Sequence, residues 1–317
     1  MTDRIWITWE NQRRNRTLSR HLQAKLFQLD YKLSRPLRYP VVVFLTMFII
    51  LREWPRTIFV QNPSFLLALF AVVLGRLFHK PIIVDAHYAG LFPMAGNNKL
   101  LNTITRFITR NAYQTIVTTE DLKQHVESLG GRAFVIPDPL PQFPNITPNK
   151  KPGTVLFICT WADDEPYLEI IKAAEKIDPT ICIYITGNSK GREKLFGKDL
   201  PPNIILTGYI SEEEFVNKLF ESDLVIDLTT RENCLVCGAY EAIGAGTPLL
   251  LSNSVALQKY FGNGAVFTDN TAADIADKIS FSISNKNELQ QKITVLKKEL
   301  VQTWNANLAE FEKIIAD

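Results

Sequence analysis

The stretch from Asp227 to Ser254, DLTTRENCLVCGAYEAIGAGTPLLLSNS, contains the residues whose types and spacing are best suited to chemistry. An apolar run ends at Asp227, a polar loop follows, and a segment of small residues predicts a helix that begins around Leu235 to Gly238. Backbone N–H groups at such a helix start, reinforced by the helix dipole, form an anion site suited to a pyrophosphate. Glu241 follows in the helix, where its carboxylate is placed to accept hydrogen bonds from the vicinal hydroxyls of a ribose.

Two candidate proton acceptors follow an apolar run in the first half of the chain. This run predicts a strand that closes with Asp85, and His87 comes two residues later. A His or Asp side chain at the end of a strand can accept a proton near neutral pH, so we predict His87 and Asp85 as candidate general bases. Two alternatives stay open: either residue orients the other, or the lone histidine is structural.

Arginines cluster in the predicted loop after the first strand. Arg13, Arg14 and Arg16 lie within four residues, and Arg20 follows one helical turn later. Guanidinium groups bind phosphate oxygens through paired hydrogen bonds, which favours a site for a phosphate or diphosphate. A solvated basic face and a nucleic-acid interface are the alternatives. Because the sequence contains no RNA-binding motif or interleaved aromatic platform, we expect no nucleic-acid partner.

The elements that must position these residues alternate along the chain. Short β-branched runs and helical stretches follow one another, which predicts parallel sheets covered by helices on both faces. In the first half we expect strands at Arg4–Trp9, Thr57–Gln61, Pro81–Asp85, Thr115–Thr118 and Ala133–Ile136. We expect helices near Leu18–Gln28, Pro40–Glu53, Pro63–Phe78, Leu100–Asn111 and Glu120–Leu129.

The second half repeats this scheme. We expect strands at Thr154–Thr160, Ile181–Thr186, Asn203–Leu206, Leu224–Asp227, Leu249–Ser252 and Ala265–Thr268. We expect helices near Glu165–Ile177, Glu212–Glu221, Gly238–Ala245, Ala272–Ser284 and Glu288–Ile315. Residues 137–153 contain six prolines, which cannot continue a helix or a central strand and indicate a linker. The predicted fold is α/β with two Rossmann-like domains, 1–147 and 148–317, and with ligands in a cleft between them.

Charge divides the chain near the same place. Residues 1–150 hold 19 Lys and Arg against 9 Asp and Glu, whereas the remainder holds 16 basic and 24 acidic residues. The first half is therefore suited to an anionic partner. Four cysteines in 317 residues are too few for a disulfide framework, which favours a reducing compartment.

Two apolar runs in the basic half are candidates for contact with a membrane. Val41–Leu51 and Phe65–Leu74 are eleven and ten residues long, whereas a helix needs roughly 20 apolar residues to cross a bilayer. Basic and aromatic residues, which suit the headgroup region of an anionic membrane, bracket the first run: Arg35, Arg38, Tyr39, Arg52, Trp54 and Arg56. Burial against a sheet is the alternative for both runs. The N-terminus lacks a signal-peptide pattern, so we expect a cytoplasmic protein that is peripheral on the membrane.

The segment Glu241–Pro248, EAIGAGTP, resembles the donor-binding segment of GT-B glycosyltransferases, particularly the GT4-like group. The likeness extends to Ile185–Asn188 and to Asn203–Ile210, and it covers roughly residues 154–285. A weaker and shorter likeness, at Phe59–Pro63, is to mannosyltransferases that act on polyprenyl-diphosphate-linked sugars.

The resemblance implies roles for individual residues. Glu241 would bind the nucleotide ribose, and the backbone of Leu235, Val236 and Cys237 would hold the pyrophosphate. The family has a second glutamate eight residues before the first, where this chain has Asn233, with Glu232 one residue earlier; either would contact the sugar. The remaining donor-binding residues implied by the likeness are Gly187, Asn188 and Tyr209, of which Tyr209 would lie near the nucleobase.

One departure from the family concerns charge. GT4-like enzymes place an Arg and a Lys after the first strand of this domain, whereas Cys159–Glu165 here is acidic. A departing nucleoside diphosphate needs its negative charge stabilised. The candidate substitutes are Arg231, Lys190 and Arg192, and Arg231 is best placed beside the predicted helix start.

Taken with the charge split, the resemblance implies a metal-independent glycosyltransferase with no cofactor. It would move a sugar from a nucleoside-diphosphate sugar to a lipid-linked glycan acceptor at an anionic membrane surface. The residues that would bind the acceptor are Arg13, Arg14, Arg16 and Arg20. In GT-B enzymes the last helix returns to the first domain, which Trp304 and Phe311 would suit as anchors. Two alternatives stay open: a sugar-nucleotide epimerase on the same scaffold, and a catalytically silent partner subunit.

Overall fold

The computed structural model describes residues 3–32, 34–62, 64–143, 149–192 and 200–316. The chain forms two units, one of Met1–Asp138 with Trp304–Asp317 and one of Pro139–Thr303. The first stretch of the first unit thus ends at Asp138, while the predicted boundary between residues 147 and 148 lies outside the described residues.

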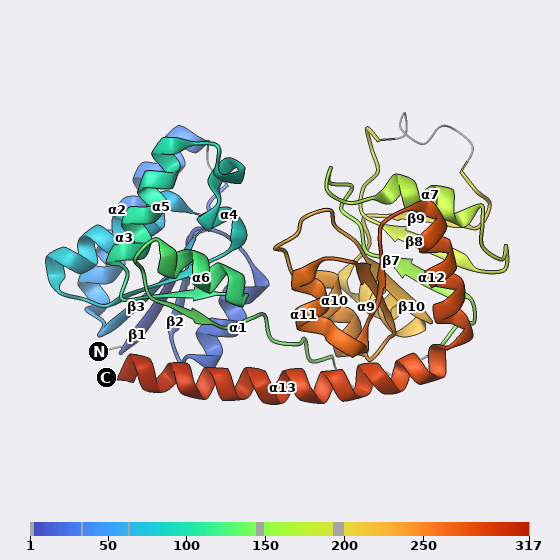
Figure 1. Cartoon of the computed structure of the whole chain (residues 1–317). Helices are drawn as coiled ribbons and strands as arrows, with labels where there is room; N and C mark the ends of the chain where they lie inside the picture. The colour runs from blue at the N-terminus through green and yellow to red at the C-terminus, as the bar shows by residue number, and fades with distance from the viewer. Residues whose placement is uncertain (1–2, 33, 63, 144–148, 193–199, 317) are drawn as a thin grey trace. The chain divides into compact units, whose positions relative to one another are not determined.

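The first unit contains a sheet of parallel strands in the order β2-β1-β3-β4-β5-β6 (Figure 1). Its strands are β1 (Arg4–Thr8), β2 (Lys25–Gln28), β3 (Thr57–Asn62), β4 (Ile82–Ala86), β5 (Gln114–Val117) and β6 (Ala133–Val135). The chain leaves β1 toward β2 and then returns to the other side of β1 as β3. Ligands of open α/β sheets bind at the carboxyl ends of the strands where the order reverses in this way, which here is between β1 and β3.

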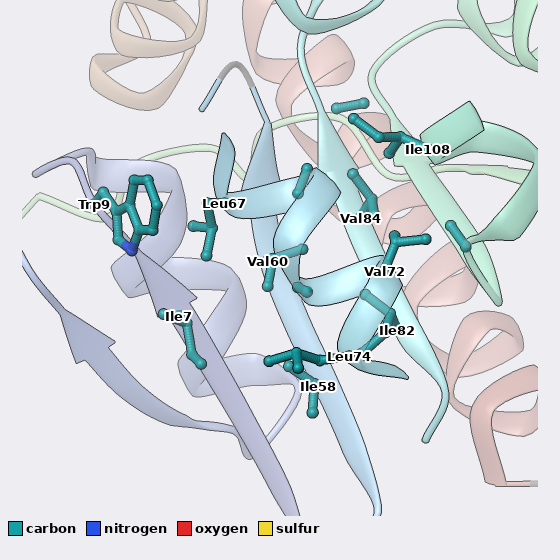
Figure 2. Packing of buried hydrophobic residues seen from close by; sticks show 14 of the residues in the cluster. Ile7, Trp9, Ile58, Val60, Leu67, Val72, Leu74, Ile82, Val84 and Ile108 are labelled. Carbon is teal, nitrogen blue, oxygen red and sulfur yellow. The ribbon is translucent and has the colours of Figure 1, made fainter. Parts of the chain in front are cut away.

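Most helices of the first unit cover one face of this sheet. The helices are α1 (Arg13–His21), α2 (Arg35–Glu53), α3 (Phe65–Phe78), α4 (Tyr88–Leu91), α5 (Lys99–Asn111) and α6 (Glu120–Ser128), with a 3₁₀ turn η1 (Pro93–Gly96). Alternate strand residues point to the same face, and on one face they meet α2, α3, α5 and α6. Figure 2 shows part of this core: Ile7, Ile58, Val60, Ile82 and Val84 from strands, Leu67, Val72 and Leu74 from α3, and Ile108 from α5.

The opposite face of the first sheet is covered by α1 and by the end of the last helix, α13 (Lys286–Ala316). Trp6 and Phe59 stack there with ring centroids 5.3 Å apart, and Phe311 is fully buried. The indole N–H of Trp304 donates a hydrogen bond to the carbonyl of Pro137 at 3.0 Å. The end of the last helix therefore belongs to the first unit, as expected for Trp304 and Phe311.

The second unit contains six parallel strands in the order β12-β11-β10-β7-β8-β9 (Figure 1). They are β7 (Thr154–Phe157), β8 (Cys182–Thr186), β9 (Ile204–Gly208), β10 (Leu224–Asp227), β11 (Leu249–Ser252) and β12 (Val266–Thr268). Counted within the unit, this is the 3-2-1-4-5-6 order of dinucleotide-binding Rossmann domains. The order reverses between β7 and β10, so the loops after these two strands flank the expected ligand edge.

Helices cover both faces of the second sheet. They are α7 (Tyr167–Ala174), α9 (Glu212–Glu221), α10 (Cys237–Ala245), α11 (Val255–Phe261), α12 (Ala272–Ser284) and the first part of α13, with a 3₁₀ turn η2 (Gly262–Gly264). Residues of α7 and α12 pack on one face, and residues of α9, α10, α11 and α13 pack on the other. The α/β prediction with two Rossmann-like units is therefore confirmed.

One local prediction was wrong, and it changes the setting of the arginine cluster. A helix was expected near Leu18–Gln28, but α1 ends at His21 and Lys25–Gln28 forms the edge strand β2. Gln23 has φ of 51°, a left-handed conformation that ends the helix, and Leu26 then pairs with Trp6 of β1. Because α1 begins at Arg13, the arginines lie on the first turns of a helix and not in a loop.

We predict that Phe311→Ala destabilises the first unit by about 3–5 kcal/mol, because it removes a fully buried aromatic ring. Urea unfolding followed by tryptophan fluorescence measures this loss. The matched control is Phe44→Ala on α2, where the residue is 68% exposed and the change should stay within about 0.5 kcal/mol. Unfolding of Phe311→Ala at the wild-type midpoint would mean that the last helix contributes nothing to this core.

Candidate functional site

The loops after β7 and β10 are joined at the ligand edge of the second sheet. The side-chain hydroxyl of Thr229 donates a hydrogen bond to Asp164 Oδ2 at 2.9 Å, and the backbone N–H of Thr230 donates to the Asp164 carbonyl at 2.8 Å. Asp164 belongs to the loop after β7, and the two threonines follow β10. The two loops that flank the reversal therefore hold each other in place.

A carboxylate of the chain itself is bound by the amides that follow β7. Glu165 Oε2 accepts hydrogen bonds from the backbone N–H of Thr160 and of Ala162, each at 2.9 Å, and Oε1 accepts one from the Thr160 hydroxyl at 2.9 Å. Trp161 between them has φ of 64°, which turns neighbouring N–H groups toward one side. The loop thus forms an anion-binding nest, and Glu165 fills it.

A second internal carboxylate lies at the start of α10. Asp227 ends β10 on the face toward α10, and it accepts hydrogen bonds from the backbone N–H groups of Gly238 and Ala239. A Cβ on Gly238 would lie 2.6 Å from Asp227 Oδ2, so only glycine allows this approach. The N-cap residue of α10, Val236, supplies no side-chain cap. Asp227 therefore takes over the capping of the helix.

This arrangement reduces the number of backbone amides that the start of α10 offers to a pyrophosphate. The helix start was predicted to present its amides to a ligand, but two of them are bonded to Asp227. The backbone of Leu235, Val236 and Cys237, named for the cradle, lies just before that pair. Glu241 lies on the second turn of α10 and is half-buried.

Negative charge accumulates at this edge. Burial raises the pKa of Asp227 well above its ordinary value, and the nearby carboxylates of Glu165 and Glu241 raise it further, against the opposing effect of the two amide hydrogen bonds. Because the proton is favoured in the folded state, Asp227 binds it at pH values at which the unfolded chain has released it.

The candidate cations for a diphosphate are paired with the acidic loop. Arg231 donates a hydrogen bond to Asp164 Oδ1 at 3.0 Å, and Arg192 donates one to Asp163 Oδ1 at 2.7 Å. Lys190 is exposed. The arginine predicted to lie beside the helix start is thus held against the loop after β7.

The other predicted donor residues lie along the same edge. Gly187 follows β8 with φ of 82° and forms a bridge with Gly208 at the end of β9, which brings it next to Tyr209. A Cβ on Gly187 would meet the Cys159 carbonyl at 2.3 Å. Tyr209 is 93% exposed. Three further residues predicted to bind the donor are also exposed: Asn188, Glu232 and Asn233.

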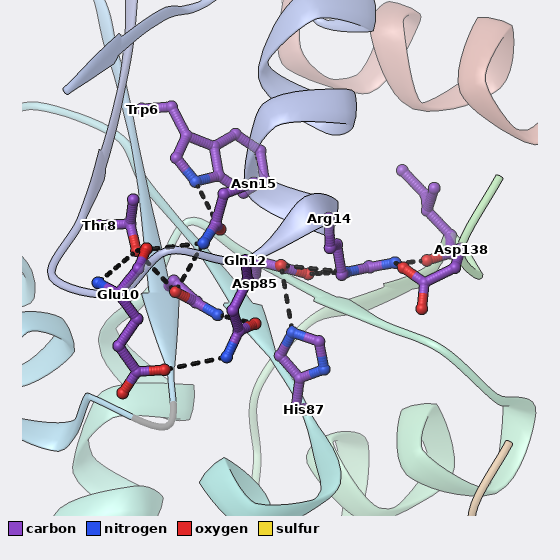
Figure 3. Close-up of polar contacts among 11 residues, drawn as sticks. Trp6, Thr8, Glu10, Gln12, Arg14, Asn15, Asp85, His87 and Asp138 are labelled. Atoms are coloured by element: carbon purple, nitrogen blue, oxygen red, sulfur yellow. Dashed lines mark hydrogen bonds and ion pairs between the residues drawn. The ribbon is translucent and has the colours of Figure 1, made fainter. Parts of the chain in front are cut away.

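The first sheet also ends in polar residues, on the face toward α1 (Figure 3). Thr8 is the last residue of β1, Gln61 and Asp85 are the last but one of β3 and β4, and all three are buried. The Thr8 hydroxyl lies 2.6 Å from Gln61 Oε1, which also accepts a hydrogen bond from Asn15 Nδ2 at 2.8 Å. Gln61 in turn donates to Gln12 at the start of α1. This polar layer fixes α1 over the carboxyl edge of the sheet.

Arg14 has a different setting from the one predicted. Its side chain is 4% exposed, and its guanidinium donates to Asp85 and Asp138 and to the Ile136 carbonyl (Figure 3). Burial alone would lower the pKa of this guanidinium, but the two carboxylates hold it above its ordinary value. Arg14 therefore belongs to a buried ion-pair network, which leaves no side-chain face for an acceptor phosphate.

The other three predicted acceptor residues are exposed on α1. Arg13, Arg16 and Arg20 are spaced by three and four residues, which places them on one face of the helix. Their role in binding an acceptor stays a prediction.

The two candidate bases lie close together but differ in access. Asp85 has 1% of its side chain exposed and is bonded to Arg14, whereas His87 has 28% exposed. His87 Nε2 lies 3.8 Å from Asp85 Oδ2 and has no hydrogen-bond partner among the described residues. His87 is therefore the better placed of the two to meet a substrate.

Sequence reasoning missed three residues of these edges: Asp138, Glu165 as a nest ligand and Asp227 as a helix cap. The position of Asp227 could have been predicted from strand alternation. Asp227 lies two residues after Val225, so both side chains point to the face of the sheet that packs on α10. The pairing of Arg14 with Asp85 spans 71 positions of sequence and left no local signal. Among the described residues, no group of three or more His, Cys, Asp or Glu is arranged to hold a metal ion.

We predict that Asp227→Asn changes the pH dependence of stability. Wild-type stability should fall as pH rises from about 4 toward the raised native pKa, because the folded state then holds a proton that the unfolded chain releases. The variant lacks this loss, so its stability relative to wild type should grow by about 1.4 kcal/mol for each pH unit of that range. Urea unfolding between pH 4 and 8 measures this.

The control is Asp277→Asn at an exposed position of α12, which should show no such trend. A relative stability of Asp227→Asn that declines with pH would mean that the carboxylate is ionised and that the amides stabilise its charge.

Comparison with known proteins gives structural neighbours only. No protein-family model matches the chain, and no curated protein matches it in sequence. The structure is similar to sucrose-phosphate synthase from Thermosynechococcus elongatus, with a TM-score of 0.71, 16% identity, and coverage of 92% of this chain and 82% of that one.

It is also similar to HepE from Anabaena in complex with UDP-glucose, with a TM-score of 0.71, 13% identity, and coverage of 98% of this chain and 92% of that one. A glycosyltransferase from Rickettsia africae gives a TM-score of 0.68 at 13% identity, with 98% and 88% of the two chains covered. These neighbours share the GT-B architecture of two Rossmann-like domains. This chain therefore has the GT-B fold.

Proposed function

We propose that this protein is a glycosyltransferase that transfers a sugar from a nucleoside-diphosphate sugar to a membrane-associated saccharide linked to polyprenyl diphosphate. The observation that carries the proposal is the architecture of the second unit. Its sheet has the Rossmann strand order, this order reverses between β7 and β10, and the small-residue helix α10 follows β10. HepE, a neighbour of the same fold, is bound to UDP-glucose in its structure, which supports a nucleotide-sugar donor.

The donor binds along the carboxyl edge of β7, β8, β9 and β10. Half-buried Glu241 accepts hydrogen bonds from the ribose, and exposed Tyr209 lies beside the base. The diphosphate binds the backbone at residues 235–237, next to the amides that Asp227 holds. Arg231 is 56% exposed, so its pair with Asp164 is screened by water and exchanges for a phosphate at little cost.

The acceptor binds the first unit. Its diphosphate meets the exposed arginine face of α1, which consists of Arg13, Arg16 and Arg20. His87 at the end of β4 accepts the proton of the acceptor hydroxyl, since its ring is partly exposed and Asp85 is closed in by Arg14. We propose a reaction without a metal ion or cofactor.

The first unit contacts the membrane through an apolar face of α2. Five apolar residues of α2 have the spacing of one helix face, and each is at least 39% exposed: Leu37, Val41, Phe44, Phe48 and Leu51. On α3, Leu66, Val73 and Leu77 are exposed as well. None of the helices in the described ranges is long and apolar enough to cross a bilayer. Exposed Arg52 and Arg56 at the end of α2 suit anionic headgroups, and we propose a peripheral location on the cytoplasmic side.

A catalytically silent partner subunit is the second candidate. The observation that favours it is the filling of both amide clusters at the donor edge by Glu165 and Asp227. The two candidates differ in turnover, because a silent subunit binds a nucleotide or glycan without releasing a nucleoside diphosphate.

We predict that one nucleoside diphosphate among UDP, GDP, ADP and TDP stabilises the protein. At a hundred times its dissociation constant the gain is about 2.7 kcal/mol, measured by thermal unfolding with and without ligand. Glu241→Gln should weaken this binding roughly 10- to 100-fold, because a charge-assisted hydrogen bond to the ribose is lost. Glu299→Gln, at an exposed position of α13, serves as the control. Equal affinity of both variants, or no response to any nucleotide, would remove the donor assignment.

We also predict that Phe44→Glu with Phe48→Glu weakens sedimentation with vesicles containing phosphatidylglycerol. Each substitution places a charge where an aromatic ring would enter the headgroup region, so affinity should fall at least roughly tenfold. The control is Phe281→Glu on α12 of the second unit, which is 51% exposed and leaves α2 unchanged. Equal sedimentation of the double variant and wild type would disprove the α2 membrane face.

A further inference from the structure

We propose that Arg14 is a positioning residue for His87: it fixes the orientation of Asp85 beside the histidine for proton transfer, and it ties this pair to Asp138, the last residue of the first unit before the chain enters the second. The proposal rests on the proposed function of His87 as the base. It replaces contact with an acceptor phosphate as the role of Arg14.

The contact between Arg14 and Asp85 is of the kind that fixes the plane of a carboxylate. Arg14 Nε lies 3.0 Å from both oxygens of Asp85, and Nη2 lies 2.8 Å from Oδ1. The side chains are 4% and 1% exposed. A planar guanidinium that donates several hydrogen bonds to one carboxylate restricts its rotation, and burial removes competition from water.

The same guanidinium bridges to the far side of the sheet edge. Nη1 donates to Asp138 Oδ1 at 2.7 Å, and Nη2 donates to the Ile136 carbonyl at 2.8 Å. Asp85 is the last residue but one of β4, whereas residues 136 and 138 follow β6, and β5 lies between these strands. Arg14 therefore couples the position of Asp85 to the residues that end the first stretch of the first unit, Met1–Asp138, after which the chain enters the second unit.

His87 completes the arrangement (Figure 3). Its Nε2 is buried and faces Asp85 Oδ2 at 3.8 Å, so the exposed part of the ring lies on its other atoms. This distance is longer than a hydrogen bond, so Asp85 acts on the ring through its charge, which favours a proton on the nearer Nε2. Nδ1 is then the proton acceptor, because a neutral imidazole carries one N–H and one lone pair. The carboxylate thus selects the reactive nitrogen, and Arg14 holds the carboxylate.

The proton and electrons balance in this step. The acceptor hydroxyl gives its proton to His87 Nδ1 while its oxygen forms a bond to the anomeric carbon of the donor. The bond from that carbon to the phosphate oxygen breaks, and its electron pair leaves with the nucleoside diphosphate. The network contains one guanidinium and two carboxylates, so it has a net charge of −1. This charge compensates the positive charge that His87 gains with the proton. Glu10, on the loop before α1, is bonded to Gln12.

The test compares Arg14→Gln, Arg14→Lys and Asp85→Asn, with Arg132→Gln as an exposed control in the same unit. The assay is release of UDP from UDP-glucose across pH 5–9. We expect Arg14→Gln to lower kcat about 100-fold, as for a misplaced catalytic group, and to shift the acidic limb of the pH profile with KM for the donor unchanged. Arg14→Lys should recover only part of the rate, because an ammonium cannot form the planar fork.

The double variant Arg14→Gln with Asp85→Asn separates positioning from binding. If Arg14 acts through Asp85, the double variant loses no more rate than Asp85→Asn alone and is more stable than Arg14→Gln, in which a buried carboxylate is left unpaired. Multiplicative losses of rate would overturn the proposal. So would a raised KM for the acceptor at unchanged kcat, which is the result expected if Arg14 bound the acceptor phosphate.

A readout without turnover keeps the proposal distinct from the proposed function. The NMR signal of the His87 ring should titrate with a different midpoint in Arg14→Gln than in wild type, and with the wild-type midpoint in Arg132→Gln. If the wild-type protein releases no UDP, the failure concerns the donor or the activity, and this titration still decides the role of Arg14. An unchanged midpoint in Arg14→Gln would overturn that role.

Discussion

The carboxyl group of Asp227 against the first amides of α10 is the interaction on which the second unit's edge depends. Backbone N–H groups at a helix start need partners, and α10 lacks a side-chain cap of its own. Asp227 provides one from the end of the neighbouring strand, and Gly238 lets the carboxylate approach. Because these amides face Asp227, our proposal places an external diphosphate toward residues 235–237, where the loop after β10 turns into the helix.

The same physical rule organises the edge of the first unit. A buried guanidinium is costly unless carboxylates and carbonyls compensate it, and Arg14 meets that condition through Asp85, Asp138 and the Ile136 carbonyl. Removing one partner of such a pair destabilises the protein, because the remaining charge is buried without compensation. Groups held in this way move little, which suits them to orient a neighbour and not to bind a ligand. The side chain of His87, outside the pair, is 28% exposed, which suits the role of base that we propose for it.

Strong local patterns made much of the fold predictable. Strands β10 and β11 and helices α9 and α12 have the expected bounds, because apolar strand runs and a clear N-cap serine or threonine mark them. Edge strand β2 was read as helix, since its alternation is short and its pairing to β1 is not a local property. The arginine cluster showed its charge in the sequence, but which arginine is buried depends on Asp85 and Asp138, which are distant in the chain. The GT4-like grouping and the individual donor residues stay predictions.

A crystal structure with the nucleoside diphosphate that stabilises the protein tests the central claim most directly. Our account predicts phosphate oxygens within about 3 Å of the backbone nitrogens of residues 235–237, a ribose on Glu241, and Asp227 still bonded to Gly238 and Ala239. A nucleotide bound away from this edge would contradict the account, as would phosphates that displace the Asp227 carboxylate from the amides of α10.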